Sequence, residues 1–182
     1  MVDPWEGAVV ETYTGGRFDL LDPDPDDVRR RDIAAALAHT CRFGGHCRHF
    51  YSVAHHSIHV SHELPDDEPR LQLLGLFHDA GEAYLGDVPR PLKAEYDLFD
   101  DIEGRVLDAV WNAVGVDPPS DDEWTRVMAA DDRLLAYEAS SLLEDGSWTD
   151  RSPDLGYDLR SDSVAEIRER FLARGERLSD RL

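Results

Sequence analysis

The sequence has almost no lysine, few sulfur-containing residues and no long apolar run. Of 19 basic residues only Lys93 is a lysine, and 39 acidic residues bring the formal net charge to -20. A chain this acidic is not expected to bind nucleic acid, because a polyanionic partner requires a basic face. Carboxylates in excess, with arginine in place of lysine, are typical of proteins from a high-salt cytoplasm. We therefore expect a protein of a high-salt organism.

The small number of cysteines and the absence of long apolar stretches indicate where the protein is located and argue against a zinc site built from cysteines. Cys41 and Cys47 are the only cysteines, and their spacing is a poor zinc signature. Residues 1–6 contain no basic and apolar leader pattern, and no stretch approaches the length of a membrane span. We expect a cytoplasmic protein with reduced thiols and no membrane contact. With 182 residues and 41% hydrophobic content, it is expected to form a single domain with a substantial core.

The apolar residues recur mostly at helical spacing. Branched and aromatic residues on both sides of Gly15 and Gly16 predict a short β-hairpin over residues 8–22. The fold class predicted is all-α with a small N-terminal hairpin, divided into a flap at 1–25, a helical core at 28–145 and a C-terminal helix at 160–182. Apart from the helix that carries His78 and Asp79, the expected helices cover residues 28–40, 52–63, 96–114, 122–143 and 164–178.

Residues 76–93 carry the densest chemistry. An apolar run leads directly into His78 and Asp79, so a buried helix is expected to deliver an imidazole and a carboxylate side by side. Glu82 falls on the same helical face one turn later, and Asp87 follows Gly86, where the helix is expected to end. Ionised groups in an apolar setting are costly unless they are paired, which favours a metal ion or a hydrogen-bonded pair.

The expected helix at 52–63 carries four histidines. His55, His59 and His62 share one face, whereas His56 points about 100° away, toward an apolar side. A solvated face is the favoured interpretation of the three, and an adventitious metal site or a pH-sensitive patch are the alternatives. Taken alone, a histidine among apolar neighbours, such as His56, is more often a hydrogen-bonded core residue than a metal ligand.

Three motifs resemble the HD phosphohydrolase superfamily, in the branch of the bacterial 5′-deoxynucleotidases and phage dATP triphosphohydrolases. Residues 51–57 are similar to the family's Ser-Val-Ala-(Glu/Gln)-His-Ser segment, which selects His56, although His55 stands where Glu or Gln is usual. Residues 78–93 resemble the block His-Asp-x-x-Glu-x-x-x-x-Asp-x-Pro-x-Pro-x-Lys. Ala130-Asp-Asp-Arg-Leu-Leu135 resembles the final Ala-Asp-x-x-Leu-Leu segment and selects Asp131 over Asp132. The predicted hairpin has no counterpart in the deoxynucleotidases.

The resemblance implies an HD-domain helical bundle, which assembles as a homo-oligomer of two or more chains. It implies one divalent metal ion per chain, either Mn, Co, Fe, Ni, Zn or Mg, a choice consistent with mixed imidazole and carboxylate ligands. Glu82 would position or deprotonate the attacking water, and Asp87 would hold substrate or assist proton transfer. The implied metal ligands are His56, His78, Asp79 and Asp131, and the candidate substrate-binding residues are Arg42, Phe43, His46 and Lys93.

The expected function is hydrolysis of (deoxy)nucleoside 5′-phosphates by a metal-oriented water. Two alternatives stay open: a dNTP triphosphohydrolase that releases triphosphate, and a metal-containing nucleotide sensor without turnover. Intact Glu82 and Asp87 favour an enzyme, since a sensor does not need a water activator. Hydrolysis of cyclic nucleotides or guanosine tetraphosphate occurs elsewhere in the superfamily, but the Gly-Asp-x-Pro-x-Pro block at 86–91 points away from it.

Overall fold

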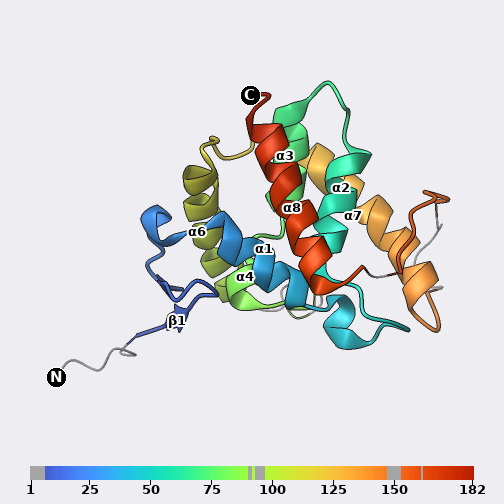
Figure 1. Ribbon diagram of the computed structural model, residues 1–182, viewed down its shortest axis with the longest axis horizontal. Coiled ribbons are helices and arrows are strands. Elements are labelled where there is room, and N and C mark those ends of the chain that lie inside the picture. The colour runs from blue at the N-terminus through green and yellow to red at the C-terminus, as the bar shows by residue number, and fades with distance from the viewer. Residues whose placement is uncertain (1–6, 90–91, 93–96, 147–152, 161) are drawn as a thin grey trace.

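The computed structural model describes residues 7–89, 92, 97–146, 153–160 and 162–182, with residues 97–100 described by their backbone only. The chain is mostly helical and has one small two-stranded antiparallel sheet near its N-terminus (Figure 1). The expected fold class is thereby confirmed at this level. Among the described residues, no helix combines the length and apolarity needed to cross a membrane.

The hairpin pairs β1 (Val9–Glu11) with β2 (Arg17–Asp19), and Val10 faces Phe18 in the register. Gly15 has φ of 79°, a left-handed conformation that glycine adopts without steric cost. The hairpin is fixed to the helices at two points. Phe18 is fully buried against Tyr84, with ring centroids 3.9 Å apart, and the carboxylate of Asp32 accepts from both the backbone N–H and the hydroxyl of Thr14.

Four helices form the central layer: α1 (Arg30–His39), α2 (Val53–Glu63), α3 (Pro69–Phe77) and α8 (Val164–Ser179). A short 3-10 turn at Pro25–Asp27 precedes α1, and a second one at Arg42–Gly45 follows it. The C-terminal helix α8 crosses the other three helices of this layer, as Figure 1 shows in red. Although α8 is polar overall, Ile167, Phe171 and Leu178 are buried, together with Arg174. Phe171 meets Phe77 edge to face, with centroids 5.2 Å apart.

The remaining helices are the short α4 (Glu82–Leu85), then α6 (Asp97–Val114) and α7 (Asp121–Leu142). α7 begins at a capping box, in which Ser120 accepts from the backbone N–H of Glu123 and the Glu123 carboxylate accepts from Ser120. On α6, Val106, Val110 and Trp111 are buried and pack into the core.

The segment around His78 differs from the expected single helix. α3 ends at Phe77, and α4 begins at Glu82 after a tight turn. Within the turn each backbone hydrogen bond links residues three positions apart, as from the N–H of Glu82 to the carbonyl of Asp79. This tighter turn still places Glu82 one turn after Asp79, as the sequence predicts. α4 ends at Gly86, which has φ of 79°.

Candidate metal centre

The first imidazole comes from α2. Ser52 caps this helix through the backbone N–H of His55, and the next residue, His56, is completely buried. His56 Nδ1 lies 2.8 Å from Glu138 Oε1. A carboxylate only accepts hydrogen bonds, so Nδ1 carries a proton, and Nε2 offers its lone pair whenever the ring is in its neutral form. That atom lies 3.1 Å from Asp131 Oδ1 and 3.6 Å from Asp79 Oδ2.

The second imidazole and the first carboxylate come from the turn after α3. His78 Nδ1 lies 2.8 Å from the carbonyl oxygen of Gly75, which fixes the proton on Nδ1 and leaves the Nε2 lone pair free. His78 Nε2 is 3.3 Å from Asp79 Oδ2 and 4.0 Å from Asp131 Oδ1. Two chain segments thus direct ring nitrogens at the same pair of carboxylates.

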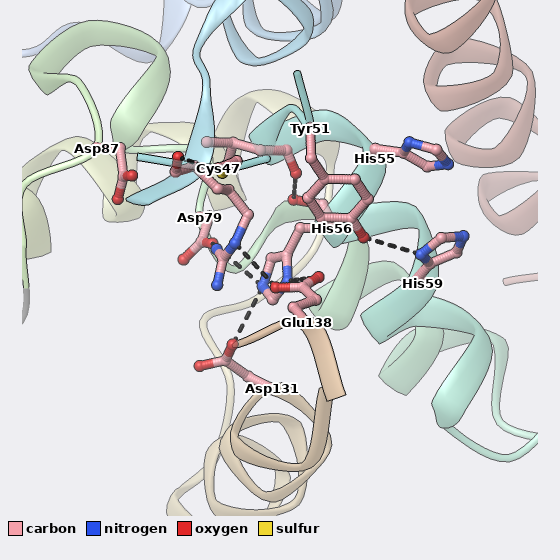
Figure 2. Close-up of polar contacts among 12 residues, drawn as sticks. Cys47, Tyr51, His55, His56, His59, Asp79, Asp87, Asp131 and Glu138 are labelled. Atoms are coloured by element: carbon pink, nitrogen blue, oxygen red, sulfur yellow. Dashed lines mark hydrogen bonds and ion pairs between the residues drawn. The ribbon is translucent and has the colours of Figure 1, made fainter. Parts of the chain in front are cut away.

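These groups fit a bound cation. Potential ligand atoms of His56, His78 and Asp79 all lie within 4.8 Å of one another. Both Nε2 atoms are buried and accept no hydrogen bond from the residues that the structure describes, so each can give its lone pair to a cation. Each imidazole is also oriented by a hydrogen bond on its other nitrogen, as metal-binding histidines usually are. Figure 2 shows Asp131 approaching His56 from α7, so a third segment reaches the cluster.

The electrostatics of the cluster favour positive charge at its centre. Burial by itself would lower the pKa of His56, as would Arg42, but Glu138 and Asp131 outweigh both and raise it to about 9. Burial would raise the pKa of Asp79, yet His78, His56 and Arg42 hold it well below its usual range. The pKa of Asp131 is about 2 despite burial, because His56 and His78 stabilise its charged form. Both carboxylates are therefore ionised near neutral pH.

Glu138 is a central residue that the sequence predictions did not assign. It is fully buried and contacts His56 through one oxygen and Arg42 Nε, at 3.0 Å, through the other. The nearby Tyr51 hydroxyl also helps to lower the pKa of this carboxyl. A signal was present, since Glu138 follows Asp131 by seven residues on α7 and so lies on the same helical face.

Arg42, predicted to bind substrate, lies inside the cluster. Its side chain is about one-tenth exposed, with Nη1 3.5 Å from Asp79 Oδ2. Burial would lower its pKa, but Glu138, Asp79, Asp131 and Glu82 outweigh this effect and raise it. The guanidinium therefore stays charged beside the candidate ligands, where it both neutralises carboxylates and borders the site.

The other predicted site residues are distributed around this centre. Glu82 is buried at the start of α4, close enough for its charge to act on Arg42. Asp87 is half-buried and accepts a 3.4 Å hydrogen bond from the backbone N–H of Gly44, next to the Arg42 turn. Phe43 packs with a small cluster around Tyr51, and its ring lies 5.4 Å from the Arg42 guanidinium carbon.

Two predicted substrate-binding residues, His46 and Lys93, are not found among the described buried groups of the cluster. His46 is exposed on the connector after Gly45. Lys93 lies outside the described residues, as do the arginine and the second proline, residues 90 and 91, of the block that begins at His78. The expected lysine contact is therefore still a prediction.

The prediction of a solvated histidine face is wrong for two of its three members. His55 and His59 are 2% and 5% exposed, and only His62 faces solvent. The Tyr51 hydroxyl lies 3.0 Å from His59 Nδ1, and Tyr157 stacks on the His59 ring with centroids 4.2 Å apart. Tyr157 follows His59 by 98 residues, so the local sequence around α2 could not reveal this cover.

These buried histidines should make the fold sensitive to acid. Burial lowers the pKa of His55 to about 4 and that of His59 to about 2, whereas an unfolded histidine titrates near about 6.5. Below that value the unfolded chain binds protons that the folded chain does not. We therefore expect the free energy of unfolding to decrease as the pH is lowered below this value, by up to about 1.4 kcal/mol per pH unit for each histidine.

Urea unfolding at several pH values between about 7 and about 5 measures this slope. Other groups titrate in the same range, so the decisive quantity is the difference between variants. His59→Gln should reduce the slope, while His39→Gln, on the exposed end of α1, should leave it unchanged. Equal slopes for the parent and the His59 variant would contradict the assignment.

No family model matches the chain. It is 36% identical to the uncharacterized protein YfdR of Escherichia coli over 142 residues, which cover 78% of this chain and 76% of that protein. The chain therefore belongs to the same family as YfdR. It is also 42% identical to an uncharacterized protein of Rhodobacter capsulatus over 87 residues, or 44% of each chain.

Proposed function

We propose that this protein is a metal-dependent phosphohydrolase with an HD-type fold, acting on (deoxy)nucleoside 5′-phosphates. One observation carries the proposal. Four side chains from three separate segments, in the chain order His, His-Asp, Asp, converge so that two buried ring nitrogens face two carboxylates. A cation held between these groups would accept both nitrogen lone pairs and offset the two carboxylate charges.

The residues that would hold the ion are His56, His78, Asp79 and Asp131. Two imidazoles and two carboxylates suit Mn, Co, Fe, Ni or Zn, and Mg is the alternative supported by the carboxylates. When bound, such an ion would supply Lewis acidity toward a phosphate oxygen and lower the pKa of a coordinated water. Assembly into dimers or larger oligomers is part of the same proposal.

The surrounding residues divide the remaining chemistry. Glu82, buried and one turn after Asp79, would accept the proton of the attacking water. Arg42 would stabilise the charge that develops on the phosphoryl oxygens, since its guanidinium already borders the cluster. Asp87 would act at the edge, where it is linked to the Arg42 turn through Gly44. Phe43 would provide an aromatic surface for the nucleobase beside Arg42.

The decisive assay measures orthophosphate and triphosphate release from a panel of deoxynucleoside and ribonucleoside mono-, di- and triphosphates with Mn, Co or Mg at high salt. Orthophosphate from monophosphates is the expected result. Triphosphate from a dNTP would instead place the protein among the triphosphohydrolases. Bound metal and nucleotide without turnover would support a sensor and contradict the enzyme.

Glu82→Gln separates proton transfer from metal binding. The amide keeps the size of the side chain but cannot accept a proton, so we expect kcat to fall by roughly 10²–10⁴-fold while the metal content stays at the parent level. Phosphate release and metal analysis of the same preparation measure the two effects. Glu169→Gln, an exposed carboxylate on α8, is the matched control and should change neither. A parent-like rate for the Glu82 variant would remove Glu82 from the mechanism.

A further inference from the structure

The two cysteines of the chain lie at the two ends of the turn that carries Arg42. Cys41 immediately precedes the 3-10 turn Arg42–Gly45, and Cys47 follows it by two residues. Both thiols are free and partly exposed, so each is accessible to a reagent in solution. The sequence of 182 residues contains no other cysteine, and both therefore belong to one short stretch beside the candidate metal centre.

The turn folds back on itself and brings the second thiol to the start of the turn. Cys47 Sγ donates a 3.2 Å hydrogen bond to the carbonyl oxygen of Arg42, the residue that follows Cys41 directly. Phe43 and Gly44 produce the reversal, because both have left-handed backbone conformations, with φ of 55° and 59°. Such a conformation is costly for an aromatic residue, so the surrounding contacts must hold the turn in place.

Both ends of the turn also meet the same neighbouring segment. Cys41 forms an isolated antiparallel bridge with Ser52, and Cys47 packs with the buried cluster around Tyr51. The acidity of the thiols agrees with this placement. Burial and the adjacent Cys41 thiol together raise the pKa of Cys47 to about 12. One thiol affects the pKa of another in this way only at short range, so the two sulfur atoms lie close together.

We propose that Cys41 and Cys47 form a reversible intramolecular disulfide, which acts as a redox-sensitive switch of the Arg42 turn. The disulfide would replace the weak hydrogen bond from the Cys47 thiol by a covalent link and hold the turn in its folded-back form. Arg42 contacts Glu138 at 3.0 Å and Asp79 at 3.5 Å, so the switch would act on a residue that borders the metal centre.

A small disulfide such as oxidised glutathione would be the oxidant. The Cys41 thiolate attacks one of its sulfurs, forms a mixed disulfide and releases one glutathione thiolate. Cys47 then loses its proton to water, attacks the Cys41 sulfur and releases the second glutathione thiolate. Cys41 no longer carries a negative charge at this stage, which makes the proton loss easier. In total, the two protein thiols are oxidised and one glutathione disulfide is reduced to two thiols.

Mass spectrometry of the full chain tests whether the bond forms. Reduced protein is incubated under native conditions with excess oxidised glutathione, and the remaining thiols are then alkylated. The main product should be lighter than the reduced protein by two hydrogen atoms, should take up no alkylating reagent, and should return to the reduced form with dithiothreitol. Unreacted thiols, or glutathione that stays attached to the cysteines, would overturn the proposal.

The same equilibrium in urea distinguishes a turn built for the disulfide from two thiols that are merely near in sequence. A folded turn already holds the sulfurs together, so the disulfide should be favoured at least about tenfold more strongly in the folded protein than in the unfolded chain. An equal or weaker preference in the folded protein would contradict the proposal.

Amide hydrogen exchange tests the effect on the turn. Oxidation should slow exchange at residues 42–48 at least about threefold, because the covalent link opposes local opening. Cys47→Ser keeps a donor for the Arg42 carbonyl, and in this variant and in Cys41→Ser the oxidant should not slow exchange. Unchanged exchange in the oxidised parent, or equal slowing in either variant, would contradict the switch. These measurements need neither metal nor substrate, so their outcome is independent of the proposed phosphohydrolase activity.

Discussion

His78→Ala should abolish both metal binding and phosphohydrolase activity. The ring supplies one of the two lone pairs at the centre, and its orientation is fixed by a 2.8 Å hydrogen bond to Gly75. Without it, the remaining side chains offer one imidazole and the carboxylates of Asp79 and Asp131. The loss of one of about four ligands should weaken the affinity so strongly that the metal ion is lost during dialysis.

Metal analysis after dialysis against Mn or Co, together with phosphate release, measures this loss. His62→Ala is the matched control, because His62 is an exposed histidine on α2 that is not part of the cluster. The control should retain the parent metal content. Stoichiometric metal in the His78 variant would show that the ion binds elsewhere and would remove the basis for the proposed function.

Glu138→Gln should strongly destabilise the fold. Glu138 is fully buried, and its charge balances Arg42 at 3.0 Å and orients His56 at 2.8 Å. Burial would raise its pKa, but His56 and Arg42 together lower it, so the carboxylate is ionised. Removing one partner of a buried ion pair typically costs about 3–5 kcal/mol. Asp79 stays near Arg42, so we expect a loss of about 2–3 kcal/mol in the free energy of unfolding.

The same substitution should weaken metal binding without removing a ligand. Groups that orient a metal-binding histidine typically contribute about 10–100-fold to affinity, and we expect a decrease of this size. Denaturant unfolding and metal titration provide the two values. Glu144→Gln is the control, because Glu144 lies just beyond α7 in an exposed ion pair with Arg48 and should affect neither quantity. Parent-like stability and affinity for Glu138→Gln would mean that Arg42 and His56 do not depend on this carboxylate.

Much of the local structure follows from short-range patterns. The hairpin forms around Gly15, as predicted. Ser52 and Ser120 each cap a helix through the side-chain hydroxyl, and the apolar residues of α6 are buried at helical spacing. His78 and Asp79 emerge at the end of an apolar helix for the same reason. Each of these features depends on residues within a few positions of one another, so the local physical chemistry is sufficient to predict them.

Other features depend on residues far apart in the chain. Glu138 had no assigned role, although its place seven residues after Asp131 was visible, because its importance comes from contacts with Arg42 and His56. His59 was expected at the surface because α2 alone does not reveal that Tyr157 covers it. The short turn between α3 and α4 was also missed, since apolar periodicity does not distinguish a continuous helix from two successive turns.

The sequence by itself determined which groups this protein has for chemistry: the histidines and carboxylates, their placement on helix faces, and the acidic excess that surrounds them. The tertiary structure alone decided which of them meet. It brings His56, His78 and Asp79 within reach of one ion, places Asp131 beside both imidazoles, and encloses Glu138 with Arg42. The physical reason is that spacing along a helix fixes direction, whereas burial and pairing depend on the segment that packs against it.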